Sequence, residues 1–275
     1  MTYANLMVHL ELGRANAGLL RITGEIAERF NAGVIGIAAR PPLTMVYGDG
    51  YISGDLYEQD QIETAREMRA AEAEFRAALS AHVGTLEWRS STSFGLVADY
   101  LAAESRSADL LITGVAAGGV FDSSRAVNTG DLVMQAGRPV LTVPTAATTL
   151  PLAHVLVAWK DTREARRALS DALPLLQRAT AVSVVEIAAE LDLDAAHGHV
   201  ADVVHWLKRH RVEARASVHR STGDDAAALY ALGQDQGIDV IVAGAYGHSR
   251  LREWVLGGVT RDLLLSANRC AIVSH

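Results

Sequence analysis

Residues 244–260, GAYGHSRLREWVLGGVT, hold the residue types in this chain best suited to binding a ligand. Glycines open, interrupt and close this segment, which follows the apolar run DVIVA (239–243) and runs into a stretch typical of a helix start (257–267). Glycine lacks a Cβ, so it permits positive φ and lets backbone N–H groups approach a ligand closely. A strand, a glycine-rich loop and a helix N-terminus together favour an anion such as phosphate. The alternative interpretation is that these glycines only serve turns and helix caps.

Other residues that could do chemistry do not combine into a site. His197, His199 and His205 suggest zinc, but the first two face different ways on a helix and no cysteine or carboxylate cluster completes a tetrahedral set. Asp109 and Asp239 precede apolar runs and are expected to end the turns before buried strands. No nucleophile, base and orienting group come together. We therefore expect neither catalytic residues nor a metal site, with slow ATPase activity left open.

Composition limits the classes of function. The chain has 275 residues, 49% of them hydrophobic and 5% aromatic, which predicts an aliphatic core. A formal net charge of −7 argues against a general nucleic-acid binder. The single cysteine, Cys270, lies in the apolar run CAIV and is expected to be buried, consistent with a reducing cytoplasm. Because no apolar run is long enough to cross a bilayer and no secretory signal is visible, we expect a cytoplasmic protein without a membrane partner.

The elements that would position the glycine loop occur in two copies. ADLLITGVAAGG (108–119) matches IDVIVAGAYGHS (238–249), and GRPVLTV (137–143) matches NRCAIVS (268–274). Within each copy, short β-branched runs alternate with longer amphipathic stretches. Such alternation predicts right-handed crossovers and a parallel sheet. The sequence therefore predicts a repeated α/β unit.

These patterns predict two tandem Rossmann-like domains, residues 1–147 and 151–275, with TAATTLP (145–151) as the linker. In the second copy the expected strands are 154–159, 181–188, 213–219, 239–243 and 270–274, and the expected helices are 162–178, 195–210, 224–236 and 258–267.

The first copy carries an insertion near residues 40–61, RPPLTMVYGDGYISGDLYEQDQ, which is rich in proline, glycine and tyrosine. A long Ala/Glu/Arg helix is expected to follow it, through residue 82. The insertion is interpreted either as a solvated surface loop or as a lid or partner contact at the ligand-binding edge of the sheet.

Taken together, the chain resembles the universal stress protein family in its tandem two-domain form. The second copy carries that family's nucleotide-loop pattern, in which two residues and then nine separate three glycines, here Gly244, Gly247 and Gly257. The resemblance implies an open five-stranded parallel sheet in each domain, in the order 3-2-1-4-5 and flanked by helices, with the domains related by a pseudo-twofold axis. It also implies ATP or AMP binding in members that keep the loop.

Carried over to this chain, the family's nucleotide site falls in the second domain. The amides of Gly247 and Gly257 would surround the phosphates, Gly244 would lie near the ribose, and Thr260 would offer its hydroxyl to a phosphate. The full set of residues implied for the site is Lys160, Asp161, Ile187, Ala243, Gly244, Gly247, His248, Ser249, Gly257, Gly258, Val259 and Thr260.

Two positions depart from the family pattern. Gly258 stands where the family usually has Ser or Thr, so an amide donor is kept and a hydroxyl is lost. Lys160 stands where the family usually has an Asp, with Asp161 one residue later. A lysine cannot accept a hydrogen bond from an adenine amino group, although it can meet a phosphate.

The first copy departs further. It has Ala117 and Ala126 where the second copy has its second and third loop glycines, Val127 where Gly258 follows, and Glu11 after its first strand. Side chains there would crowd a closely bound phosphate, so no nucleotide is expected in the first domain.

The favoured interpretation is a cytoplasmic, non-catalytic, nucleotide-responsive stress protein. The alternative is an interaction scaffold that has lost nucleotide binding and engages a protein or an apolar ligand. The last strands of the two copies, near 139–143 and 270–274, are expected to lie side by side because sheet edges invite pairing. The chain would then form an intramolecular pseudo-dimer, with further homodimerisation left open.

Overall fold

The structure is a computed structural model that describes residues 2–43, 54–115, 127–245 and 269–275. Its first half contains β1 (Asn5–His9), α1 (Ala17–Phe30), β2 (Gly33–Ala39), α2 (Gly54–Leu79), β3 (Leu86–Ser91), α3 (Val97–Glu104), β4 (Leu110–Gly114), α4 (Thr129–Ala136) and β5 (Val140–Val143). Its second half contains β6 (His154–Trp159), α5 (Arg163–Leu176), β7 (Ala181–Ala188), α6 (Leu193–Arg209), β8 (Ala214–Arg220), α7 (Asp225–Asp235), β9 (Val240–Gly244) and β10 (Cys270–Ser274).

These bounds confirm the predicted alternation of strands and helices. All five strands predicted in the second copy are present, and three of its four predicted helices begin and end within a few residues of the expected positions. The fourth, at 258–267, lies outside the described residues.

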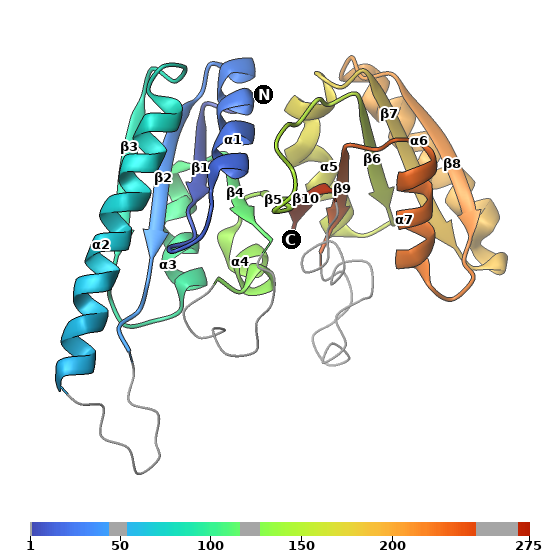
Figure 1. Ribbon diagram of the computed structural model, residues 1–275. Coiled ribbons are helices and arrows are strands. Elements are labelled where there is room, and N and C mark those ends of the chain that lie inside the picture. Colours follow the sequence, from blue (N-terminus) through green and yellow to red (C-terminus); the bar gives the residue numbers. More distant parts are fainter. Residues whose placement is uncertain (1, 44–53, 116–126, 246–268) are drawn as a thin grey trace, which may run out of the picture.

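Within the described ranges, ten strands form one continuous sheet, in the order β3-β2-β1-β4-β5-β10-β9-β6-β7-β8 (Figure 1). Each half has the predicted order 3-2-1-4-5 and is parallel throughout. β5 and β10 pair antiparallel at the centre, with Leu141 opposite Ile272. The predicted contact between the last strands is therefore confirmed. A pseudo-twofold axis that relates the two halves produces this arrangement, because it pairs the equivalent strands β5 and β10 antiparallel and mirrors the strand order on either side of them.

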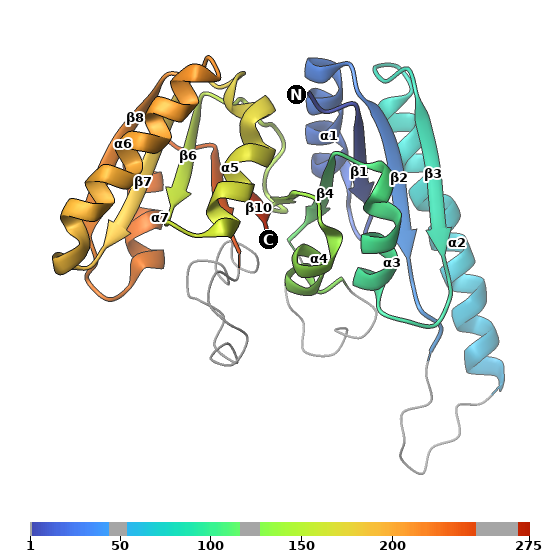
Figure 2. The ribbon, with the colours of Figure 1, turned by 180° about the vertical axis from the view of Figure 1, so that it is seen from behind.

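Helices cover both faces of the sheet (Figures 1 and 2). One core cluster joins side chains of the sheet to α1, α2, α5 and α6, and a second joins the opposite face to α3, α4 and α7. Both clusters are built largely from Val, Leu, Ile and Ala, as the composition predicts. Cys270 is among the buried residues, and burial raises the pKa of its thiol to about 12, so it is an inert thiol in the core.

The prediction that the long helix begins only after residue 61 is wrong. α2 begins at Gly54, so residues 54–61 are helical rather than loop, and the helix ends at Leu79 rather than near 82. Asp55 lies in its first turn, where a carboxylate interacts favourably with the helix dipole. The remaining insertion residues, 44–53, lie outside the described part of the chain.

Side-chain hydrogen bonds lie next to the central strand pair, and one of them joins the two halves. The Tyr3 hydroxyl donates to the Asp171 carbonyl oxygen at 2.7 Å, and Ser274 donates to the Asp171 carboxylate at 3.0 Å. Near the linker, the Leu150 amide donates to the Glu25 carboxylate at 2.9 Å. The Tyr3 bond ties the segment before β1 to α5 and so joins the two halves, whereas the Ser274 bond ties β10 to α5 within the second half.

Two aspartates at equivalent places support the first strand of each half. Asp109 accepts hydrogen bonds from the amides of Ala4 and Asn5 at 2.7 and 2.9 Å, and Asp239 accepts one from His154 at 2.9 Å. Both carboxylates satisfy backbone donors where a strand begins. The predicted structural role of these residues is confirmed.

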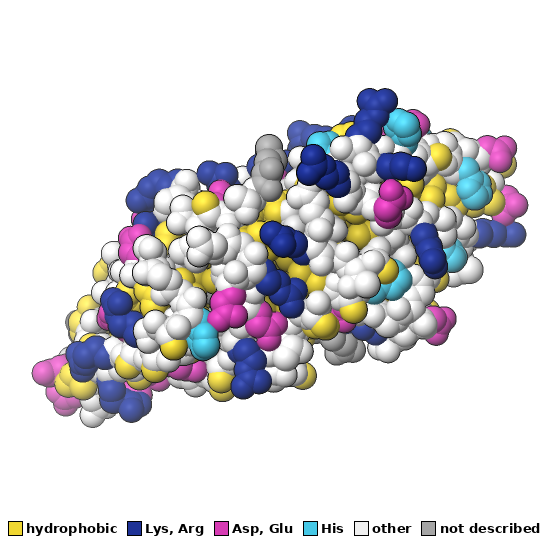
Figure 3. Space-filling view, turned by 90° about the horizontal axis from the view of Figure 1, so that it is seen from above, with side chains coloured by type: hydrophobic (Ala, Val, Ile, Leu, Met, Phe, Trp, Pro, Cys, Tyr) yellow, Lys and Arg dark blue, Asp and Glu magenta, His cyan; other side chains and the backbone are white. Residues whose placement is uncertain are grey.

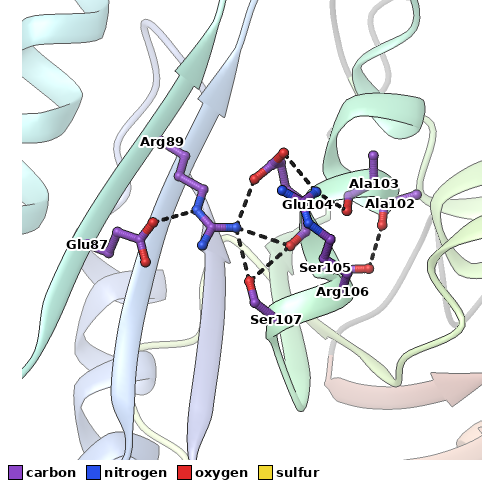
Figure 4. Close-up of polar contacts among 8 residues, drawn as sticks. All are labelled: Glu87, Arg89, Ala102, Ala103, Glu104, Ser105, Arg106 and Ser107. Atoms are coloured by element: carbon purple, nitrogen blue, oxygen red, sulfur yellow. Dashed lines mark hydrogen bonds and ion pairs between the residues drawn. The ribbon is translucent and has the colours of Figure 1, made fainter.

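The edge strand β3 is held by a network around Arg89 (Figure 4). Its guanidinium donates to Glu87 at 2.7 Å, to the Glu104 carboxylate at 2.8 Å and to Ser107 at 3.0 Å. Hydrogen bonding to Arg89 holds the pKa of Glu87 below its usual range. Because Nε and Nη1 of Arg89 both bond within the protein, this cluster anchors β3 to the end of α3.

The surface seen in Figure 3 has basic and acidic side chains interspersed, without a large patch of one sign. Within the described ranges, no helix combines the length and apolar character that crossing a bilayer requires.

Candidate functional site

The predicted nucleotide site lies where strands of the second half end. In open α/β sheets, ligands bind outside the carboxyl ends of the strands. Ala158 pairs with Ala243, so Lys160 and Gly244 follow matched positions on the neighbouring strands β6 and β9. Ile187 lies near the end of β7, the strand on the other side of β6. Five of the predicted residues therefore belong to one sheet edge: Lys160, Asp161, Ile187, Ala243 and Gly244.

Their surroundings differ. Lys160 and Asp161 are exposed in the connection between β6 and α5, and the Asp161 carboxylate accepts from Arg166 at 2.5 Å. Ala243 is buried, and Ile187 is half-buried against the core on the α7 side of the sheet. The remaining predicted residues lie outside the described part of the chain, and their placement stays a prediction: Gly247, His248, Ser249, Gly257, Gly258, Val259 and Thr260.

The structure gives Gly244 a packing role that sequence reasoning missed. A Cβ at this position would lie 2.5 Å from the Ala165 amide nitrogen and 2.5 Å from the Glu164 carbonyl carbon, so the first turn of α5 requires a glycine there. Glu164 is itself buried. Burial opposes its charge, but bonds from Arg163 and from its own backbone amide hold its pKa below the usual value. α5 therefore begins close against the end of β9.

A second missed feature is Glu186, the one acidic residue within the strand 181–188. It is buried beside Trp159, its register partner, and its carboxylate lies 3.4 to 3.5 Å from Nδ1 of His199 on α6. Burial raises the pKa of Glu186 above its usual value. The signal in the sequence was a single charge in an apolar run. Of the histidines that suggested zinc, His199 thus meets a carboxylate, but among described residues no group of three or more ligand types could hold a metal.

The first half has a cavity at its own carboxyl edge. It measures about 440 Å³ and opens across the ends of β1, β4 and β5, next to the start of α1. Its lining includes Glu11, the residue noted after the first strand, and Val127, which stands where the second copy has Gly258. Ala117 and Ala126 lie outside the described residues.

No family model matches the chain, and no curated protein matches it. Solved structures do. A universal stress protein from Archaeoglobus fulgidus DSM 4304 is 13% identical, with a TM-score of 0.75, and the match covers 98% of this chain and 95% of that one. A protein of unknown function from Pseudomonas aeruginosa PAO1 is 14% identical, with a TM-score of 0.61, and the match covers 99% of this chain and 92% of that one.

A third structure, provisionally described as a universal stress protein from Pseudomonas aeruginosa UCBPP-PA14, is 14% identical, with a TM-score of 0.62, and the match covers 99% of this chain and 93% of that one. At such identities the similarity defines the fold. The chain has the tandem universal stress protein fold over nearly its whole length.

Proposed function

We propose that this chain is a cytoplasmic, non-catalytic universal stress protein that binds an adenine nucleotide, ATP or AMP, in its second domain, residues 151–275. The first domain, residues 1–147, takes no nucleotide in this proposal. One observation carries this proposal. Gly244, the first glycine of the three-glycine pattern, lies at the carboxyl end of β9, and the neighbouring strand β6 leads into Lys160 at the same edge of the sheet.

The chemistry of this edge suits a phosphorylated ligand. The helix expected after the third glycine would present amides without intrahelical partners at the positive end of its dipole. Lys160 is exposed and forms no ion pair with any residue that the structure describes, so its ammonium is available to a phosphate. Asp161 is neutralised by Arg166 and would repel a phosphate less than a lone carboxylate.

Calorimetric titration with ATP, ADP and AMP tests the proposal, using the Gly257→Val variant and, as its matched control, Ala126→Val at the equivalent position of the first copy. We expect nucleotide binding to the unaltered chain and to Ala126→Val, and its loss in Gly257→Val, because a branched side chain would occupy the space of the phosphates. No binding at millimolar nucleotide, or equal affinity in a folded Gly257→Val variant, would contradict the proposal.

The second candidate is an interaction scaffold. Large apolar side chains are exposed on the first domain: Ile62 on α2 is 62% exposed, and Phe94 and Leu96 before α3 are 70% and 57% exposed. Large exposed apolar groups favour protein contacts. This candidate predicts a chain that is indifferent to nucleotides, so the same titration separates the two.

We also propose that the chain acts as an intramolecular pseudo-dimer. The β5–β10 ladder, supported by Tyr3 and Ser274 on Asp171, satisfies within one chain the sheet edges that would otherwise remain unpaired.

A further inference from the structure

Helix α2 extends past the body of the first domain (Figures 1 and 2). The structure buries none of residues 54–63, the first part of this helix. Burial begins further along, where the buried side chains recur every three or four residues on one face: Thr64, Met68, Ala71, Phe75 and Leu79. The first part of α2 therefore lacks packing against the domain that carries it.

A helical segment of this length gains little stability by itself. Isolated helices shorter than about 12 residues are marginal in water, and helices in proteins owe most of their stability to packing. Residues 54–63 continue a packed helix, so they need no nucleus of their own, but their side chains still bury no apolar surface. A surface that covers them would stabilise this part of α2.

One face of α2 points away from the domain. Ile62 lies two residues before the buried Thr64, and two residues turn an α-helix by about 200°, so Ile62 points to the side opposite the buried face. Its side chain is 62% exposed. Residues four and seven positions away in either direction share its side of the helix. These residues and Ile62 are all exposed and form the outer stripe of α2: Asp55, Glu58, Ile62, Arg66 and Arg69.

Charge is divided along the outer stripe. Its first two residues are acidic and its last two are basic. Asp55, Glu58 and Arg69 form no ion pair with any residue that the structure describes, whereas Arg66 bonds Glu63 on the same helix, at 2.9 Å through Nε. The helix dipole favours a carboxylate in the first turn, at Asp55, but it does not account for arginines in the middle of the helix.

This order of charges is complementary to itself when one helix is reversed. In an antiparallel pair of α2 helices with both Ile62 side chains on the twofold axis, positions equidistant from Ile62 face each other. Asp55 of each copy then lies opposite Arg69 of the other, and Glu58 lies opposite Arg66 in the same way. Such a twofold contact uses one surface on both copies. A parallel pair would instead bring like charges together.

The same arrangement covers the part of α2 that lacks packing. Residues 54–61 of one copy lie along residues 63–70 of the other, where α2 is packed on its own domain. Each unsupported segment thus gains a supported helix as its neighbour. Exposed ion pairs are individually weak and are screened by salt, so the contact is weak and sensitive to ionic strength.

From this face we infer that two copies of the chain associate through the outer stripe of α2, as an antiparallel helix pair centred on Ile62. The β5–β10 junction joins two halves of one chain, whereas this contact joins two chains at α2. The interface goes beyond the proposed function and does not depend on nucleotide binding.

Sedimentation equilibrium of the full chain tests the inference, at up to about 0.5 mM protein in about 0.05 M and about 1 M salt. We expect dimers at low salt and their dissociation at high salt, because salt screens exposed charge pairs. A chain that is monomeric at the highest concentration and the lowest salt would overturn the inference.

Reversing the charge at either end of the outer stripe identifies the surface. One double variant, Asp55→Arg with Glu58→Arg, reverses the acidic end, and the other, Arg66→Glu with Arg69→Glu, reverses the basic end. Each should weaken the dimer at least tenfold, because like charges then face each other. Equal association in folded double variants would show that the chains associate through another surface and that the inference is wrong.

Mixing the two double variants separates the contact from misfolding. In a heterodimer of the two, every facing pair again joins opposite charges, so the equimolar mixture should form dimers although neither variant does so alone. The control is Lys208→Glu with Arg209→Glu, the same change of charge on an exposed part of α6, which should leave the dimer unchanged. A mixture of folded variants that stays monomeric, or a control that weakens the dimer equally, would contradict the antiparallel pair.

Discussion

Acid should destabilise this protein through His9. The side chain is 4% exposed, and burial alone lowers its pKa from 6.5 to about 4, since no charged group contributes to the shift. The unfolded chain takes up a proton near pH 6.5, whereas the folded chain does so only near pH 4. Protons therefore favour the unfolded state between these values, and the free energy of unfolding falls as the pH falls through this window.

The size of the effect follows from the shift. Each unit of pKa difference corresponds to about 1.4 kcal/mol, so the complete loss is about 3 kcal/mol, most of it reached by pH 4.5. Above about pH 7.5 the contribution of His9 is nearly constant, and below about pH 3 it no longer changes. Other titrating groups add their own slopes, so the prediction concerns a difference between variants.

Urea unfolding at pH 7.5, 5.5 and 4.5 measures that difference. His9→Ala should lose less stability than the unaltered chain on going from pH 7.5 to 4.5, by about 2 kcal/mol, because alanine takes up no proton. The matched control is His205→Ala, at an exposed position on α6, which should keep the slope of the unaltered chain. A His9→Ala variant whose stability falls as steeply as that of the unaltered chain would refute a neutral, buried imidazole.

Two further predictions concern packing and the strand junction. Gly36→Ala should lower the free energy of unfolding by about 1–3 kcal/mol, because its Cβ would lie 2.7 Å from Trp88 and 2.9 Å from Phe75. The control Gly84→Ala, in open space, should change the free energy of unfolding little. Equal urea midpoints for the two variants would contradict this prediction. Deleting residues 270–275 removes β10 and leaves the edges of β5 and β9 unpaired. Light scattering should then detect dimers or aggregates, because unpaired strand edges pair with other chains. An unchanged mass and melting temperature would contradict this role of the β5–β10 junction.

Sequence reasoning succeeded where information is local and repeated. Strands such as 154–159 and 270–274 are short β-branched runs, and each appears twice, so one copy supports the interpretation of the other. The start of α2 at Gly54 was missed because glycine and tyrosine in 40–61 indicate a loop, whereas the acidic first turn and packing further along the helix favour the helix.

The contact of His9 with Thr113, which both line the cavity of the first half, was missed for a different reason. His9 and Thr113 are far apart in sequence, and each is one polar residue at the end of an apolar run. Only the register of β1 against β4 brings them together. Comparison of the two copies held the available signal, since both positions are alanine in the second copy.

Because both halves share a topology, differences between their sheet edges must come from connections and side chains, as expected when sites are built on a common fold. The connection from the first strand to the first helix is four residues longer in the first half, and this has a large effect. α5 packs directly against Gly244, whereas α1 begins later and leaves the space beside Gly114 open. The sheet edge of the second half, where α5 packs against Gly244, has the glycine pattern and an exposed lysine. The sheet edge of the first half, where the space beside Gly114 is open, has the neutral imidazole of His9, the carboxylate of Glu11 and the capped helix α4. The sheet edges of the two halves therefore differ in their side chains and in the space beside the strand ends, although the strand order is the same.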